Sequence, residues 1–180
     1  QHEGEMTIHL NNAESWKVTL VDTGLDTMTG GRIKRIQKYV NNERFFLTYG
    51  DGVSNVDINA LLQTHIEKKA AVTLTAVPLE ARFGMLDIDQ QGNITAFKEK
   101  LHSQTEWINS GFFVCEPEIF NYLEDDKTIW EKKPLERLSD EGKLFAHQHR
   151  GFWQPMDTLR EKLLLEDLYA SGNAAWKVWP

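Results

Sequence analysis

Strand-like and helix-like segments alternate through the first half of the chain. Three apolar runs have the length of strands, and between them apolar residues recur at the spacing of a helix. The predicted order is strand Trp16–Val21, helix Arg32–Val40, strand Phe45–Tyr49, a helix from Ile58 capped by Asp57, and strand Ala71–Val77. This order favours an α/β domain with parallel strands joined by right-handed crossovers.

Outside this region the pattern is less regular. The turn-forming residues 90–93 separate two short apolar runs, so we predict a β-hairpin over 85–97. Further strands are predicted over Thr7–Leu10, Trp107–Val114 and Leu144–His147, and helical segments over Pro117–Leu123, Ile129–Leu138 and Asp157–Ala170. In the last of these, Leu159, Leu163, Leu164 and Leu168 share the face predicted to be buried.

Composition restricts the possible functions. Of the 180 residues, 41% are hydrophobic and 26% charged, which is typical of a folded single domain. The net charge of −7 argues against binding to a nucleic-acid polymer, which usually requires a basic face. No run approaches the roughly 20 apolar residues of a membrane span, and the N-terminus lacks the pattern of a signal peptide. We therefore expect no membrane partner and a cytoplasmic location.

One cysteine and one histidine have simple structural interpretations. The single cysteine, Cys115, excludes an intrachain disulfide and ends an apolar run, so a buried, unreactive thiol is expected. His65 lies on the apolar side of its helix and is expected to be a core or boundary histidine with its hydrogen bonds satisfied.

Two aspartates stand at positions where ligands bind. Asp51 lies between two glycines at the end of an apolar strand, and ligands of α/β sheets bind beyond the carboxyl ends of the strands. Asp157 precedes the last helix. Carboxylates, completed by phosphate and water, suit Mg²⁺. The alternatives are an ordinary turn at Asp51 and a helix N-cap at Asp157.

Weaker candidates lie elsewhere, each with a structural alternative. A lysine in Lys98–Lys100 can neutralise a phosphate or belong to a solvated run of charges. Asn109, two residues before Gly111 in a strand, can bind sugar hydroxyls or mark a β-bulge. The loop at Met28–Gly31 can offer its backbone to a base or a phosphate.

Taken in order, seven segments resemble the sugar-phosphate nucleotidyltransferases, in particular their glucose-1-phosphate cytidylyltransferase branch. They are Val21–Gly24, Met28–Arg35, Tyr49–Val53, Arg82–Gly84, Phe97–Lys100, Ile108–Val114 and Gly151–Thr158. The resemblance runs from about Trp16 to the C-terminus. It implies a Rossmann-like (GT-A-like) fold with a mixed, mainly parallel sheet, flanking helices and a small β-hairpin region.

The resemblance also implies a chemistry, in which CTP and glucose 1-phosphate give CDP-glucose and pyrophosphate with Mg²⁺, and a place in lipopolysaccharide O-antigen biosynthesis. Asp51 and Asp157 would hold the metal and, with Lys100, act in catalysis, and Asp51 would also contact the nucleotide. The other implied contacts are Thr29, Gly30 and Gly31 with the nucleotide, and Gly84, Glu99, Lys100, Asn109 and Gly111 with the sugar phosphate; Arg82 is a weaker candidate.

The chain also departs from the family pattern. It contains neither the segment Gly-Gly-x-Gly-Thr-Arg-Leu nor the Pro-Lys-Pro segment that follows it, and it has Leu101 and Ser110 where proline and glycine are usual. We therefore expect residues 1–180 to form one partial, C-terminal portion of the domain, inactive alone, that forms homo-oligomers through an exposed sheet edge. The alternatives are a non-catalytic module that binds a sugar nucleotide or sugar phosphate, and an interaction protein on a truncated transferase fold.

Overall fold

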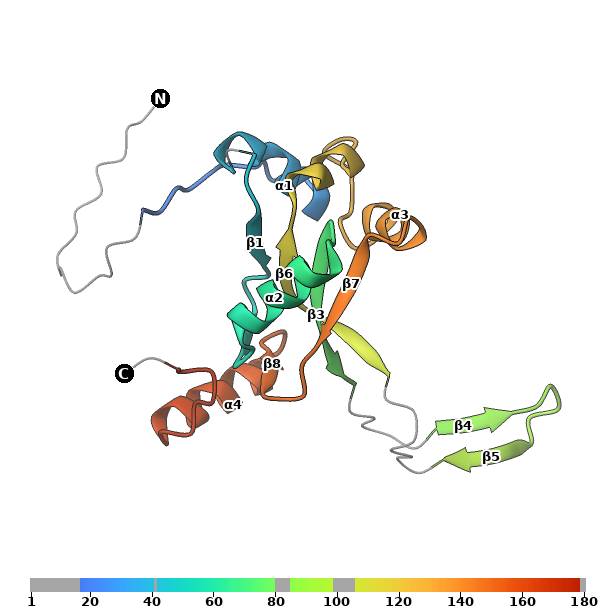
Figure 1. The fold of residues 1–180 in the computed structure, drawn as a ribbon. Helices are drawn as coiled ribbons and strands as arrows, with labels where there is room; N and C mark the ends of the chain where they lie inside the picture. Colours follow the sequence, from blue (N-terminus) through green and yellow to red (C-terminus); the bar gives the residue numbers. More distant parts are fainter. Residues whose placement is uncertain (1–16, 41, 80–84, 99–105, 179–180) are drawn as a thin grey trace.

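The computed structural model describes residues 17–40, 42–79, 85–98 and 106–178, and it has an α/β fold (Figure 1). A four-stranded sheet has the order β1-β6-β3-β7. Its strands are β1 (Phe45–Thr48), β3 (Val72–Pro78), β6 (Trp107–Cys115) and β7 (Leu144–Gln148). Because β6 is antiparallel to β1 and β3 while β7 is parallel to β3, three strands run in one direction and one opposes them. The predicted mixed sheet is confirmed.

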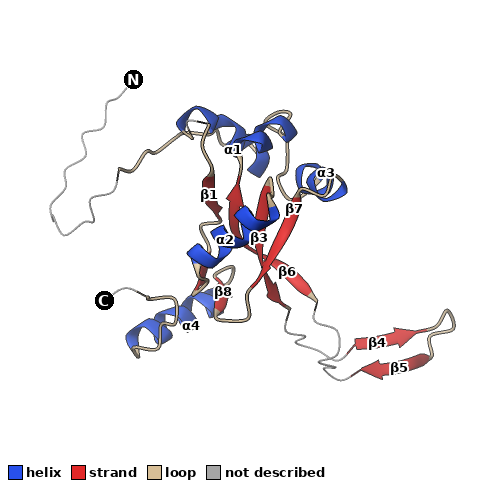
Figure 2. Cartoon of the chain, viewed as in Figure 1, coloured by secondary structure: helices blue, strands red, loops and turns tan. Residues whose placement is uncertain are grey.

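Two small two-stranded ribbons accompany the sheet (Figure 2). One pairs β2 (Gly52–Ser54) with β8 (Trp153–Pro155). The other is the predicted hairpin, formed by β4 (Met85–Ile88) and β5 (Ile94–Lys98), which projects away from the sheet (Figure 1).

Helices flank the sheet. They are α1 (Thr29–Arg35), α2 (Ile58–Lys68), α3 (Lys133–Asp140) and α4 (Leu159–Ala170), with short 3₁₀ segments η1 (Gln37–Tyr39) and η2 (Pro117–Tyr122). The carboxylate of Asp57 accepts hydrogen bonds from the backbone N–H groups of Asn59 and Ala60, so the predicted cap of α2 is confirmed. No helix in these ranges is long and apolar enough to cross a membrane.

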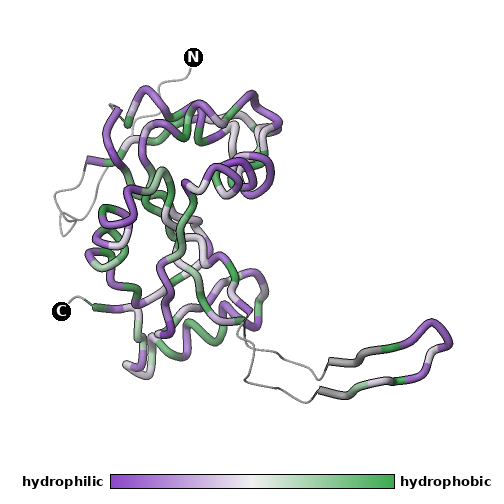
Figure 3. Tube along the Cα trace, turned by 45° about the vertical axis from the view of Figure 1, so that its right-hand side comes forward, coloured by the Kyte–Doolittle hydropathy of each residue, from purple (hydrophilic) through white to green (hydrophobic). Residues whose placement is uncertain are grey.

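The core lies between the sheet and the segments that follow β6. Trp130 and Phe113 are almost completely buried, and their rings meet edge to face at 6.0 Å. Burial of each contributes roughly 2–3 kcal/mol. Hydrophobic residues follow the strands of the sheet (Figure 3). Both the cysteine and the histidine predictions are confirmed: burial raises the pKa of the Cys115 thiol, and burial lowers the pKa of His65, whose ring nitrogens contact Thr73 and Glu116.

Two predictions about the chain's elements are wrong. Residues 17–21 form no strand, and Val18 and Leu20 are 70% and 86% exposed, because no described strand pairs with them. In α4 the buried residue is Leu165, whereas Leu159 is 69% exposed and Leu163 and Leu164 are also exposed. Three consecutive leucines occupy both faces of this helix, so the spacing alone did not identify the inner face. The strand predicted at 7–10 lies outside the described residues.

The middle of β6 contains a β-bulge. The register with β3 shifts between Leu74 and Ala76, and Gly111 has a φ of +85°. A Cβ atom on Gly111 would lie 2.5 Å from Cδ2 of Tyr49. Ser110 fits the bulge because its hydroxyl donates to the carbonyl of Thr75 at 2.9 Å. The structural alternative for this segment is therefore confirmed, and glycine at 111 is required by both conformation and space.

Replacing Gly111 tests this requirement. Gly111→Ala places a side chain on a residue with a left-handed φ and causes a clash with Tyr49. We therefore expect the free energy of unfolding to fall by roughly 2–4 kcal/mol. The matched control is Gly142→Ala, because Gly142 also has a positive φ, +67°, but no atom within 4 Å of its Cβ position. The control should lose only about 1 kcal/mol in denaturant unfolding. Equal losses in the two variants would contradict the close contact with Tyr49.

Candidate functional site

The β2–β8 ribbon brings the two predicted metal ligands to one place. Gly52 pairs with Pro155, and the N–H of Met156 donates to the carbonyl of Asp51 at 2.7 Å. Asp51 immediately precedes β2, and Asp157 follows the end of β8 by two residues. Two carboxylates that are distant in the sequence therefore lie at the same end of the ribbon.

Asp157 is not the N-cap of α4, contrary to one of the two interpretations of this residue. Thr158 is the cap, and its hydroxyl accepts from the N–H of Glu161 while the Glu161 carboxylate accepts from the N–H groups of Asp157 and Thr158. This capping box satisfies the first turn without the Asp157 side chain. The reason is that threonine followed three residues later by glutamate caps the helix one residue further along the chain.

The carboxylates of Asp51 and Asp157 are both exposed and unengaged. Neither makes a hydrogen bond or ion pair with another side chain in the described ranges. No group of three or more His, Cys, Asp or Glu residues in those ranges is arranged to hold a metal. Two carboxylates nevertheless fit Mg²⁺, which commonly takes its remaining ligands from phosphate and water.

A hydrogen-bonded network lies next to Asp51, whose carboxylate interacts electrostatically with Tyr49. The Tyr49 hydroxyl donates to Glu131 at 2.6 Å and accepts from the Asn109 amide at 3.2 Å. The other Glu131 oxygen accepts from the Thr29 hydroxyl at 2.8 Å, and the Asn109 carbonyl oxygen accepts from the Gly111 N–H at 2.9 Å. The network thus connects β1, β6, α1 and the segment before α3.

The network fixes the orientation of Asn109. Burial, and then the contact with Glu131, raises the pKa of Tyr49, so its hydroxyl keeps its proton at neutral pH and acts as a donor to Glu131. With its oxygen facing Gly111 and its nitrogen facing Tyr49, the Asn109 amide has one orientation. One N–H of that amide has no partner in these contacts and is available to a ligand.

Sequence reasoning missed Tyr49 and Glu131 as parts of this region. Tyr49 had one signal, since it immediately precedes Gly50-Asp51-Gly52. Glu131 had none, because its role depends on contacts with residues 82 and 102 positions away. Trp153 also contributes: its indole N–H donates to the carbonyl of Ser110 at 2.9 Å and ties β8 to the bulge in β6.

The predicted nucleotide loop is not a loop: Thr29–Gly31 form the first turn of α1, which packs against the protein itself. A Cβ atom on Gly30 would lie 2.7 Å from Thr128, and one on Gly31 would lie 2.7 Å from Asp126. The N–H of Gly31 donates to the carbonyl of Thr128 at 3.2 Å, and the Thr29 hydroxyl is bonded to Glu131. These glycines permit close packing of α1 on residues 126–128, which is a structural role that the sequence pattern did not reveal.

The structure brings some of the predicted site residues together, whereas others lie outside the described residues. Asn109 and Gly111 lie in the network beside Asp51, while Thr29 joins it from α1 through Glu131. Gly84, Glu99 and Lys100, together with Arg82, lie outside the described residues. Their predicted roles in the sugar-phosphate pocket therefore stay predictions.

Comparison with known proteins identifies the family. A family model described as nucleotidyl transferase matches residues 1–157. The chain is 48% identical to the glucose-1-phosphate cytidylyltransferase of Salmonella typhi over 178 residues, which are 98% of this chain and 69% of that protein. It is 40% identical to a probable glucose-1-phosphate cytidylyltransferase of Bacillus subtilis over 94% of this chain and 66% of that protein.

A solved structure supports the fold. HddC from Yersinia pseudotuberculosis matches with a TM-score of 0.59 and 23% identity over 79% of this chain and 63% of that chain. The chain thus spans about two thirds of the length of these relatives. The resemblance inferred from the seven sequence segments is confirmed: the chain belongs to the nucleotidyl transferase family, as a sugar-1-phosphate nucleotidyltransferase-like protein.

Proposed function

We propose that these residues carry the metal-binding and sugar-phosphate-binding part of a cytidylyltransferase that makes CDP-glucose. The observation that carries the proposal is the β2–β8 ribbon, which leaves the Asp51 and Asp157 carboxylates exposed at one end and is tied by Trp153 to Ser110, the neighbour of Asn109. The similarity to glucose-1-phosphate cytidylyltransferases supports the choice of CTP and glucose 1-phosphate.

In this proposal the protein mainly positions the reactants. A phosphate oxygen of the sugar phosphate attacks the α-phosphorus of CTP in line, and the bond to pyrophosphate breaks. Mg²⁺, held by Asp51 and Asp157, would offset the charge that develops on the phosphates. Asn109 would donate its remaining N–H to a sugar hydroxyl, and Lys100 would lie against a phosphate as a positive point charge.

A second candidate is binding without turnover. The Gly31 N–H and the Thr29 hydroxyl are bonded to the protein, so neither is free to hold a triphosphate in this conformation. The 180 residues also contain no Gly-Gly-x-Gly-Thr-Arg-Leu segment. Preorganised donors around the transferring phosphate usually supply much of the rate enhancement. We therefore propose that a polypeptide of these residues alone binds the sugar nucleotide and releases no pyrophosphate.

Titration calorimetry and a coupled pyrophosphate assay test this proposal together. With Mg²⁺, CDP-glucose should bind, and Asp51→Asn should weaken binding by about tenfold, because it removes a metal ligand. Asp167→Asn, which changes an exposed carboxylate on α4, is the matched control and should leave the affinity unchanged. Absence of binding would refute the retained site. Pyrophosphate release that Asp51→Asn abolishes would refute the claim of inactivity.

The hydrogen bond between Tyr49 and Glu131 leads to a separate prediction about the sugar contact proposed for Asn109. Tyr49→Phe removes the acceptor for the Asn109 amide and leaves Glu131 without one donor, so the affinity for CDP-glucose should fall by roughly 5- to 30-fold, or about 1–2 kcal/mol. Glu131→Gln retains an acceptor oxygen and should have a smaller effect. Calorimetry with the exposed-site control Tyr39→Phe checks this. Unchanged affinity in a folded Tyr49→Phe protein would exclude the positioning role.

A further inference from the structure

A cavity of about 290 Å³ lies between residues 122–129 and the beginning of α3. Four basic side chains line it, whereas only two acidic residues do. The basic residues are Lys127, Lys132, Lys133 and Arg137, and the acidic ones are Glu124 and Asp125. This local excess of positive charge is opposite in sign to the net charge of the chain, −7.

Lys127 and Arg137 each interact electrostatically with one neighbouring carboxylate, Asp126 and Glu141 respectively. Within the described ranges, none of the four makes an ion pair. The Asp125 carboxylate is used in its own turn, where it accepts from the N–H of Lys127 at 2.9 Å and from the Thr128 hydroxyl at 3.3 Å. The guanidinium of Arg137 is held over the Tyr122 ring at 4.9 Å. Unpaired cations around a concavity attract anions.

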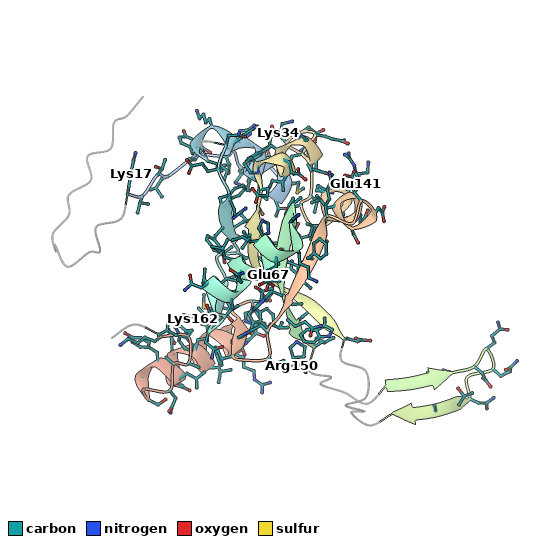
Figure 4. The ribbon with its side chains drawn as sticks, viewed as in Figure 1. Lys17, Lys34, Glu67, Glu141, Arg150 and Lys162 are labelled. Atoms are coloured by element: carbon teal, nitrogen blue, oxygen red, sulfur yellow. The ribbon has the colours of Figure 1, made fainter. Side chains whose placement is uncertain are left out.

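The cavity is separate from the site at Asp51 and Asp157. The segment that lines it lies with α1 at the upper end of the sheet, whereas β8 and α4 lie at the lower end (Figure 1). Figure 4 shows the same separation between Lys34 above and Lys162 below. Lys34 adds further positive charge at the upper end, because its ammonium group donates to the carbonyls of Leu123 and Glu124 at 2.8 and 2.7 Å.

We propose that this cavity is a second binding site, which takes a small anion with a diphosphate or triphosphate group. Several lysine point charges and one guanidinium suit an anion that carries two or more negative charges. The volume lies at the lower end of the range for small-molecule sites and excludes a macromolecular ligand from the cavity itself. Ile129 and Pro134 contribute a small apolar surface to the lining.

The wall of the cavity also contacts α1. The N–H of Met28 donates to the carbonyl of Asp126 at 2.8 Å, and that of Gly31 donates to the carbonyl of Thr128. An anion that shifts residues 126–128 therefore perturbs these two amides directly. The amide signals of Met28 and Gly31 therefore report whether the cavity is occupied, although neither residue lines it.

Amide chemical shifts of the ¹⁵N-labelled protein test the proposal. The protein is titrated with pyrophosphate in EDTA, so that no metal is held at Asp51 and Asp157. Saturable shifts are expected in 124–134 and at Met28 and Gly31, with none in 51–54. A parallel titration with CTP distinguishes the source of the phosphates: tighter binding than pyrophosphate assigns the site to a nucleotide, and equal or weaker binding assigns it to the free anion.

Two double variants with the same change in charge provide the decisive comparison. Lys132→Gln with Lys133→Gln should weaken pyrophosphate binding by about tenfold. Lys68→Gln with Lys69→Gln changes a similar exposed pair at the end of α2 and should leave it nearly unchanged. The spectra themselves report whether each variant is folded. Absence of saturable shifts in 124–134, or equal weakening by both variants, would overturn the proposal.

Discussion

The candidate site depends on a short piece of backbone pairing. Three residues of β2 pair with three of β8, and the hydrogen bond from Met156 to Asp51 extends the ribbon to the two aspartates. A ribbon this short is marginal by itself. The indole N–H of Trp153 anchors it to the bulge in β6, and the capping box fixes where α4 begins. These contacts, and not a dedicated interaction of either carboxylate, position Asp51 and Asp157.

The polar network around Tyr49 provides the second constraint. The Gly111 N–H donates to the Asn109 oxygen, the Asn109 amide donates to the Tyr49 hydroxyl, and that hydroxyl donates to Glu131, so the directions of these hydrogen bonds are mutually consistent. The absence of a Cβ atom on Gly111 lets the Tyr49 ring lie directly against β6. A bulge, a partly buried tyrosine and a carboxylate therefore act together to hold Asn109, whereas the two aspartates remain exposed.

Much of the fold follows from local sequence patterns. The apolar runs of β3 and β6, the hairpin turn and the Asp57 cap all depend on neighbouring residues, and each was predicted correctly. The strand predicted at 17–21 was wrong because a strand also requires a partner. The inner face of α4 was wrong because leucines cover both of its faces.

The site was less predictable than the fold. The positions of Asp51 and Asp157 were apparent from the ends of their elements and from the family resemblance. The part of Glu131 in the network, and the packing of Gly30 and Gly31 against residues 126–128, were not, because they arise only when segments about 100 residues apart meet. Long-range side-chain contacts leave no local periodicity in a sequence.

We propose that Asp51 and Asp157 form one divalent-metal site. Paramagnetic broadening of amide signals by Mn²⁺, used in place of Mg²⁺, measures this directly. We expect substoichiometric Mn²⁺ to broaden the signals of 50–52 and 157–158 together, and either Asp51→Asn or Asp157→Asn to abolish the broadening at both segments. Broadening at only one segment, or persistence at both after either substitution, would contradict a shared site.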